Sequence, residues 1–377
     1  MITGFRLDPP SQHRARPMVL HIDECFGVGT YIVIRNIIAG LADRFDFAVL
    51  FGNRCDRSDA TLHRDFPDVE LRRWRHAFRD IRPADDLRAL HQAVREIRRL
   101  NPDVVHCHSS KAGVLGRVAA ALTGRLPRCI YTPHGISFCQ TGHSRSQRRL
   151  FRRIEHTIAT WGGVVVACSD SEKDALSNAG IQSVLIRNGV VPQQRRACSP
   201  IRARPPWRVI TAGRIVAQKQ PDRFNDLARL FLHRSDLEFR WVGDGELRSL
   251  LTSPNIAVLG WRTREEVDEE MVNADVYCST SSSEGLPLAG LEAMSFGLPL
   301  LMSECIGNCD LVRLGNGYLF RDTSDAARWL TEALAMPQRL SRLGERSRQL
   351  VELEFSLAEM LAAYGSLYEQ LSAGGRT

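Results

Sequence analysis

The stretch at residues 281–299 reads SSSEGLPLAGLEAMSFGLP. It follows an apolar run, ADVYCST, which is typical of a short buried strand bounded by turn residues. A helix is expected next, because Pro287 suits a first helical turn, apolar residues then recur at helical spacing, and a glycine and a proline end the pattern. The stretch therefore predicts a strand, a loop that holds Glu284 and a helix that holds Glu292.

The start of this predicted helix suits an anion. Backbone N–H groups at Gly285, Leu286 and Leu288 would lack helical partners, and the positive end of the helix dipole lies behind them. Glu292 lies roughly 7 Å farther along the axis, so one carboxylate stands on each side of the anion. Ionised carboxylates accept hydrogen bonds from hydroxyls strongly. A nucleotide sugar fits this pattern, because its diphosphate lies between a ribose and a hexose.

Seven residues separate Glu284 from Glu292 within EGLPLAGLEAMSFGLP. This pattern resembles the signature of retaining glycosyltransferases with the GT-B fold, in particular family 4. Two glutamates at this spacing are otherwise typical of a solvated helix surface, but the surrounding glycines, prolines and apolar residues favour the site. The resemblance implies that Glu284 holds hydroxyls of the donor sugar and Glu292 the ribose. It also implies that the nucleotide-sugar donor is bound by Gly285, Leu286, Pro287 and Leu288.

Length and composition suit two α/β domains. The chain has 377 residues, with 44% hydrophobic and 25% charged residues, which is typical of a globular protein too long for one core. The N-terminal residues are polar and basic, and no apolar run approaches the roughly 20 residues that span a bilayer. We therefore expect a cytoplasmic protein.

Neither disulfides nor a metal site is predicted. Several of the ten cysteines lie in strand-like apolar runs, where a free thiol behaves as a small hydrophobe. His106, Cys107 and His108 are adjacent and alternate between the faces of a strand, while Cys305 and Cys309 lack a second pair at zinc-site spacing. We expect neither a metal nor another cofactor.

The net charge of +7 raises the alternative of a nucleic-acid partner. Arginine supplies almost all of the positive charge, a bias that genome composition explains. No zinc-finger, homeodomain or RNP-like motif accompanies it, so we expect no nucleic-acid partner. A basic enzyme also suits an anionic lipid surface or an acceptor that carries a diphosphate.

The first half alternates strands and helices, which predicts a parallel sheet. Gly27 and Gly29 follow the first strand, PMVLHI, and would let the backbone approach a ligand, with a plain turn as the alternative. The loop looks like a reduced form of the glycine-rich family loop that faces donor phosphate and acceptor. Ser109, Ser110 and Lys111 belong to DVVHCHSSKAGVLGR, which is similar to a common family segment. They are acceptor-side candidates, with helix capping as the alternative for the serines.

His134 ends the strand RCIYTPHG. An isolated histidine is commonly structural, but this one resembles the family histidine that contacts the donor sugar from the N-terminal domain. We therefore expect His134 to donate or accept a hydrogen bond near the reacting carbon.

An arginine-rich helix is predicted at residues 144–161, with Leu150, Ile154, Ile158 and Trp161 packing on the sheet. Its basic side chains suit either a solvated face or contact with an anionic membrane. These membrane-contact candidates are Arg145, Arg148, Arg149, Arg152 and Arg153.

The second half begins with the strand WRVITA and the loop GRIVAQKQP. Arg214 and Lys219 lie around a bend, where two cations can grip one diphosphate. The family pattern is GR-x4-KG, and Gln220 stands here in place of the usual glycine, a departure that leaves both cations in place. The resemblance extends the donor-binding set to Gly213, Gly243 and Arg262.

We predict an α/β, GT-B architecture of two facing Rossmann-like domains with parallel sheets and a cleft between them. The acceptor-side domain is placed at residues 1–193, a hinge at 194–206, the nucleotide-sugar domain at 207–355, and a helix crossing back to the first domain at 356–377. The resemblance implies a retaining hexosyltransferase in cell-surface polysaccharide or lipopolysaccharide synthesis, with a nucleotide-sugar donor, UDP ahead of GDP, and a glycan or lipid-linked acceptor. The predicted catalytic residues are Glu284, His134, Arg214 and Lys219. The alternatives are a nucleotide-sugar 2-epimerase of the same fold and a non-catalytic nucleotide-sugar or nucleic-acid binder.

Overall fold

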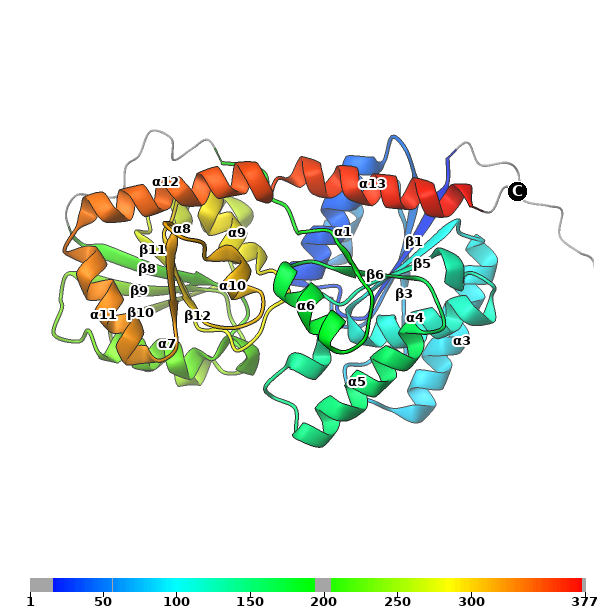
Figure 1. Ribbon diagram of the computed structural model, residues 1–377, viewed down its shortest axis with the longest axis horizontal. Coiled ribbons are helices and arrows are strands. Elements are labelled where there is room, and N and C mark those ends of the chain that lie inside the picture. The colour runs from blue at the N-terminus through cyan, green and yellow to red at the C-terminus, as the bar shows by residue number, and fades with distance from the viewer. Residues whose placement is uncertain (1–15, 56, 194–204, 375–377) are drawn as a thin grey trace, which may run out of the picture.

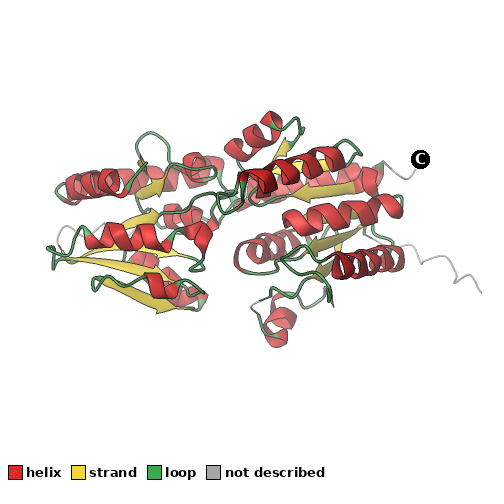
Figure 2. Ribbon diagram, turned by 90° about the horizontal axis from the view of Figure 1, so that it is seen from below, coloured by secondary structure: helices red, strands yellow, loops and turns green. Residues whose placement is uncertain are grey.

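The computed structural model describes residues 16–55, 57–193 and 205–374. Within them the chain forms two lobes, each built on one parallel sheet with helices on both faces (Figures 1 and 2). The prediction of two α/β domains with parallel sheets is confirmed. The predicted hinge at residues 194–206 lies almost wholly outside the described residues.

The sheet of the first lobe has the strand order β3-β2-β1-β4-β5-β6-β7. Its strands are β1 (Met18–Asp23), β2 (Asp46–Phe51), β3 (Glu70–Arg73), β4 (Val104–His108), β5 (Cys129–Thr132), β6 (Val164–Ala167) and β7 (Val184–Leu185). The helices are α1 (Val28–Leu41), α2 (Asp59–Asp65), α3 (Pro83–Leu100), α4 (Ser109–Leu122), α5 (Arg145–Ala159) and α6 (Asp170–Asn178). Helices cover both faces, so consecutive residues of β1, Val19 and Leu20, lie in separate buried clusters.

The sheet of the second lobe has the order β10-β9-β8-β11-β12-β13. Its strands are β8 (Trp207–Ala212), β9 (Leu237–Val242), β10 (Ile256–Gly260), β11 (Val276–Ser279), β12 (Leu300–Ser303) and β13 (Gly317–Phe320). The helices are α7 (Pro221–Arg229), α8 (Arg264–Val272), α9 (Leu288–Ser295), α10 (Asn308–Leu311), α11 (Thr323–Leu334) and α12 (Pro337–Glu354). The stretch at residues 281–299 thus joins β11 to α9, as its pattern predicts, with Pro287 as the extended residue before the helix rather than within its first turn.

Two helices at the end of the chain connect the lobes. α12 and α13 (Leu357–Ala373) lie end to end along one side of the molecule, α12 over the second lobe and α13 over the first (Figure 1). α13 buries Met360, Tyr364 and Tyr368 in the core of the first lobe. An ion pair of 2.7 Å between Arg44 and Glu369 adds to this contact. The chain therefore returns to its first lobe after completing its second.

One packing prediction is wrong. Ile158 of α5 is buried, but Leu150 is 52% exposed and Trp161 is 51% exposed. α5 packs mainly against α4 and a short 3-10 helix at residues 137–139, with a hydrogen bond from Tyr131 of β5 to Glu155, so its buried face is narrower than its apolar pattern suggests. The exposed pair therefore stands beside the arginines of this helix.

Candidate active site

A cleft of about 1990 Å³ lies between the two lobes and is lined by residues of both. It opens at the carboxyl ends of both sheets, where parallel α/β sheets bind ligands. All predicted catalytic, donor-binding and acceptor-side residues line this cleft. The five arginines of α5 do not belong to its lining. The predicted site residues therefore gather around one cleft, and the structure adds how their side chains pair.

Glu284 lies on the second lobe's side of the cleft and is only 8% exposed. Its Oε1 atom is 2.6 Å from Nζ of Lys219. Gln218 donates a hydrogen bond of 2.7 Å from its amide to the backbone oxygen of Ser283. The loop after β8 thereby holds the loop before α9, and the two predicted groups, carboxylate and ammonium, form one unit.

Glu292 points from α9 to a partner that the sequence analysis did not identify. Its carboxylate is paired with the guanidinium of Arg264, at the first position of α8. Arg264 also contacts Asp268 at 2.9 Å. Burial raises the pKa of Glu292, and the charge of Arg264 acts in the opposite direction. Arg264 and Glu292 lie far apart in sequence, so no local pattern indicated this pair.

Arg214 lines the cleft and forms no ion pair within the described part of the chain. Gln220, the departure from the family pattern, has φ 47° and ψ 64° in the left-handed region. Glycine adopts this region without strain. The loop therefore keeps the left-handed turn that a glycine would supply, and Lys219 reaches Glu284 despite the substitution.

Glycines allow the loops around the cleft to approach closely. A Cβ atom at Gly243 would lie 2.1 Å from the backbone oxygen of Gly213, and both glycines have positive φ. A Cβ atom at Gly285 would lie 2.7 Å from the carbonyl carbon of His134. The loops that hold Glu284 and His134 thus touch, one from each lobe.

Hydrogen bonds also join the lobes at the base of the cleft. The side-chain amide of Asn188 donates to the backbone oxygen of Leu286 at 3.1 Å. The backbone N–H of Ser171 donates to Asp310 at 3.0 Å. The first contact holds the loop before α9 against the first lobe, and the second holds α10 against α6.

His134 lies at the base of the cleft with a positive φ of 54°. Its Nε2 atom is 2.9 Å from Nδ1 of His108. Burial lowers the pKa of His134 to about 4, so the ring is neutral near pH 7. A non-glycine residue with positive φ is strained, and such strain concentrates at functional sites.

The acceptor-side candidates are engaged in contacts of their own. Ser109 donates a hydrogen bond of 2.9 Å to Asp23, and Lys111 contacts Asp86 at 2.6 Å. Asp23 is fully buried, and burial raises its pKa to about 6. Neighbouring Glu24 lines the cleft and pairs with Arg54 at 3.3 Å. Asp23 and Glu24 were not among the sequence candidates, although they directly follow the predicted strand PMVLHI.

The remaining candidates lie around this centre. Gly27 precedes α1 and Gly29 lies in its first turn, where a Cβ atom at Gly29 would meet nothing within 4 Å. Arg262 pairs with Glu266 at 3.0 Å on the second lobe's rim. Ser110 also lines the cleft. Gly29 therefore lacks the tight packing found at Gly285.

Two family models match the chain. The model of Glycosyltransferase Family 4 matches residues 27–194, and the model of Glycosyl transferases group 1 matches residues 200–350. This chain belongs to the family 4 glycosyltransferases. The first match ends at residue 194 and the second begins at residue 200, between the last strand of the first lobe and the first strand of the second.

Curated relatives of this family 4 chain include two Escherichia coli proteins. A UDP-Gal:alpha-D-GlcNAc-diphosphoundecaprenol alpha-1,3-galactosyltransferase is 30% identical over 260 residues, which cover 62% of this chain and 66% of the relative. The O-antigen biosynthesis glycosyltransferase WbnH is 32% identical over 227 residues, covering 58% of this chain and 62% of the relative. The chain thus spans just under two thirds of the length of these relatives.

Solved structures show the same GT-B fold. Anabaena HepE in complex with UDP and glucose has a TM-score of 0.75 at 17% identity, covering 94% of this chain and 100% of that one. Sucrose-phosphate synthase from Thermosynechococcus elongatus has a TM-score of 0.77 at 18% identity, covering 96% and 100%. At these identities the likeness concerns the fold alone.

The α5 arginines of this glycosyltransferase lie outside the cleft. Arg145, Arg149, Arg152 and Arg153 are exposed, and Arg148 is half-buried. Arg152 donates to the backbone oxygen of Asn178. Among the described residues no helix is long and apolar enough to cross a membrane.

Proposed function

We propose that this protein transfers a hexose from a nucleotide sugar, UDP ahead of GDP, to a hydroxyl of a lipid-linked glycan acceptor, with retention at the anomeric carbon. One observation supports this most directly: Arg214, the Lys219–Glu284 pair and the start of α9 face His134 across one cleft. The bond from the anomeric carbon to the diphosphate breaks, and a bond to the acceptor oxygen forms. The acceptor's proton leaves with the diphosphate.

The departing diphosphate gains negative charge as the reaction proceeds. Arg214, Lys219 and the free N–H groups at the start of α9 would stabilise this charge more in the transition state than in the ground state. Glu284 would accept hydrogen bonds from sugar hydroxyls and Glu292 from the ribose. These groups are cations and dipoles of the chain itself, so the proposed reaction needs no metal.

The first lobe suits an acceptor that carries a diphosphate. Its side of the cleft carries arginines from several elements: Arg35, Arg54, Arg57, Arg64 and Arg79. The E. coli galactosyltransferase acts on a sugar linked to diphosphoundecaprenol. An acceptor of this kind would place its diphosphate among these arginines and its sugar hydroxyl near His134.

A lipid-linked acceptor lies at a membrane surface, and α5 suits contact with one. Its exposed arginines stand beside exposed Leu150 and Trp161. Arginine attracts anionic headgroups, and exposed leucine and tryptophan enter the interface. We propose a cytoplasmic enzyme that binds the inner face of an anionic membrane through α5.

A donor screen tests the proposed activity. Thermal unfolding is measured with UDP-, GDP- and ADP-sugars, because a ligand at a hundred times its dissociation constant adds about 2.7 kcal/mol. The stabilising donor is then incubated with and without diphosphate-linked acceptors. Transfer to an acceptor is the expected result, whereas conversion of the donor in buffer alone would establish the epimerase, and binding without turnover a non-catalytic protein.

Arg214→Ala should abolish most of this transfer, with Arg248→Ala as the matched control. Arg248 is an exposed arginine of the same lobe that pairs with Asp244 at 2.8 Å and does not line the cleft. Equal activity in the two variants would contradict the proposed role of Arg214.

Membrane binding is tested with sedimented vesicles of neutral or anionic phospholipid. The double variant Arg149→Glu, Arg153→Glu should weaken binding to anionic vesicles. The control is the double variant Arg98→Glu, Arg99→Glu, which makes the same charge change on α3. Equal binding by both double variants would exclude α5 as the contact.

A further inference from the structure

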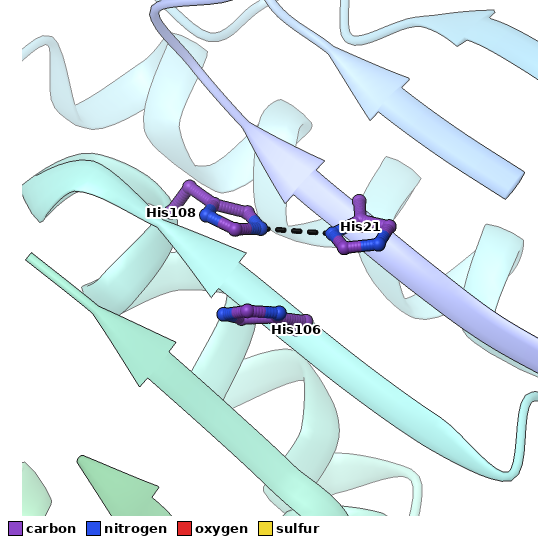
Figure 3. A group of neighbouring side chains, drawn as sticks. All are labelled: His21, His106 and His108. Carbon is purple, nitrogen blue, oxygen red and sulfur yellow. Dashed lines mark hydrogen bonds between the residues drawn. The ribbon is translucent and has the colours of Figure 1, made fainter. Parts of the chain in front are cut away.

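Three buried histidines meet inside the first lobe (Figure 3). His21 lies on β1, and His106 and His108 lie on the same face of β4. All three have no exposed surface. Nδ1 of His21 is 2.8 Å from Nε2 of His108. His21 is the member that the sequence analysis missed, because its strand pairs with β4 only in the fold.

His108 also connects this cluster to the cleft. Its other ring nitrogen, Nδ1, is 2.9 Å from Nε2 of His134. The rings of His108 and His134 are stacked, with centroids 5.2 Å apart. A continuous row of three imidazoles therefore runs from His21 through His108 to the cleft-lining His134. The remaining ring nitrogen of His134 is Nδ1.

A metal ion is the first alternative for such a cluster. One ring nitrogen from each of the three histidines lies within 4.8 Å of the others. However, both ring nitrogens of His106 have hydroxyl partners, Tyr368 at 2.8 Å and Thr132 at 2.9 Å. A metal would also replace the close contact between His21 and His108. The geometry is therefore that of a hydrogen-bonded network.

The row permits two arrangements of its hydrogens. Burial lowers the pKa of His21 to about 3, of His134 to about 4 and of His108 well below its ordinary value. Each ring is therefore neutral near pH 7 and carries one N–H. Because each contact needs one donor and one acceptor, all three N–H groups must point the same way along the row, either toward the cleft or toward His21.

The inner end of the row decides between these arrangements. Nε2 of His21 is buried and has no hydrogen-bond partner among the described residues. If the N–H groups pointed inward, this atom would carry an orphaned N–H, which is rare and costly in protein interiors. If the N–H groups point toward the cleft, Nε2 of His21 is instead an acceptor without a partner. An unpaired acceptor costs less free energy than an unpaired N–H.

We propose that His21 and His108 are positioning residues that fix His134 as the tautomer with its hydrogen on Nδ1, so that His134 presents a hydrogen-bond donor to the substrate. His21 donates to His108, His108 donates to Nε2 of His134, and the N–H of His134 is left for an oxygen atom in the cleft. This inference deepens the proposed glycosyl transfer, in which that oxygen belongs to the donor sugar.

Two-bond ¹H–¹⁵N spectra of ¹⁵N-histidine-labelled full-length protein at pH 7.5 test the tautomer directly. The signals of His134 are assigned by their loss in His134→Asn. A wild-type spectrum with protonated Nδ1 and unprotonated Nε2 supports the proposal, and protonated Nε2 overturns it. The spectrum of the wild-type protein requires no substrate, so this test stands whether or not the proposed transfer is observed.

Two substitutions at His108 separate positioning from mere packing. The amide nitrogen of asparagine can take the place of Nδ1, whereas that of glutamine takes the place of Nε2. His108→Asn should therefore keep the His134 tautomer, and His108→Gln should lose it and lower kcat/KM for the sugar donor about tenfold while the Kd for UDP stays unchanged. Thermal unfolding checks that both variants are folded. Equal spectra and kinetics for two folded variants would contradict the positioning role of His108.

Discussion

The ammonium of Lys219 lies 2.6 Å from the carboxylate of Glu284, although the sequence assigned one to the diphosphate and the other to the sugar. Their side chains are 22% and 10% exposed, so the pair is shielded from much of the solvent. In this arrangement each group neutralises the other. Binding of a donor would bring a second anion to Lys219 and hydroxyls to Glu284, without leaving either charge unpaired.

Lys219→Met should therefore lower stability as well as transfer activity. Removing one partner leaves a poorly solvated carboxylate, which costs about 1–3 kcal/mol of unfolding free energy. Glu284→Gln in the same chain should recover most of that stability while activity stays low. Urea unfolding of the two single variants and the double variant measures the coupling, and a purely additive result would show that the pair contributes nothing.

Gln220→Gly should stabilise the protein relative to Gln220→Ala. Both variants remove the side chain, but only glycine adopts φ 47° without strain. Left-handed backbone costs a non-glycine residue roughly 1–2 kcal/mol, and the greater freedom of glycine in the unfolded chain offsets part of the gain. We expect a difference of about 1 kcal/mol by urea unfolding. A less stable glycine variant would show that the loop is not strained.

The fold could be predicted to a large extent because its signals are local. Residues 281–299 encode strand, loop and helix in one stretch, and β11 and α9 lie where that pattern puts them. Alternating strands and helices indicated the parallel sheets. Short, half-exposed elements such as β3 carry weaker patterns, and β3 was not anticipated.

The pairing of site residues could not be predicted in the same way. Glu292 meets Arg264 and Lys219 meets Glu284 through contacts between separate loops. His21 joins His108 because β1 and β4 are neighbours in the sheet although other elements separate them in sequence. A single sequence shows which residues end strands, and the folded chain decides which of them face one another.

Gly285→Ala should disturb the contact between the lobes. A Cβ atom there would lie 2.7 Å from the backbone of His134 and 2.8 Å from that of Gly135. Backbone cannot move aside as a flexible side chain can, so we expect the lobes to separate slightly and the transfer rate to fall by at least tenfold. Small-angle scattering and kinetics measure the two effects.

Gly29→Ala is the matched control for this substitution. Gly29 also lines the cleft, but nothing lies within 4 Å of its would-be Cβ atom, and it lies in the first turn of α1. Alanine is the better helix former by about 1 kcal/mol, so this variant should be at least as stable as the wild type and keep its scattering profile. An equal change of scattering in both variants would contradict the role assigned to Gly285.

Asp23→Asn should change how stability depends on pH. The pKa of Asp23 is raised from 3.8 to about 6 by burial. Between these values the folded protein binds more protons than the unfolded chain, so the unfolding free energy contributed by Asp23 falls as pH rises. The ionised carboxylate then costs on the order of 3 kcal/mol above pH 6, a cost that asparagine does not carry.

Unfolding free energies of both proteins at pH 4.5 and 7.5 test this sign. The buried histidines, whose pKa values are lowered, favour the folded state as pH rises, but they do so in both proteins and cancel in the comparison. Asp23→Asn should therefore gain unfolding free energy relative to the wild type as the pH rises from 4.5 to 7.5. An unchanged difference would mean that Asp23 titrates near its ordinary pKa and that its burial is relieved by solvent from the cleft.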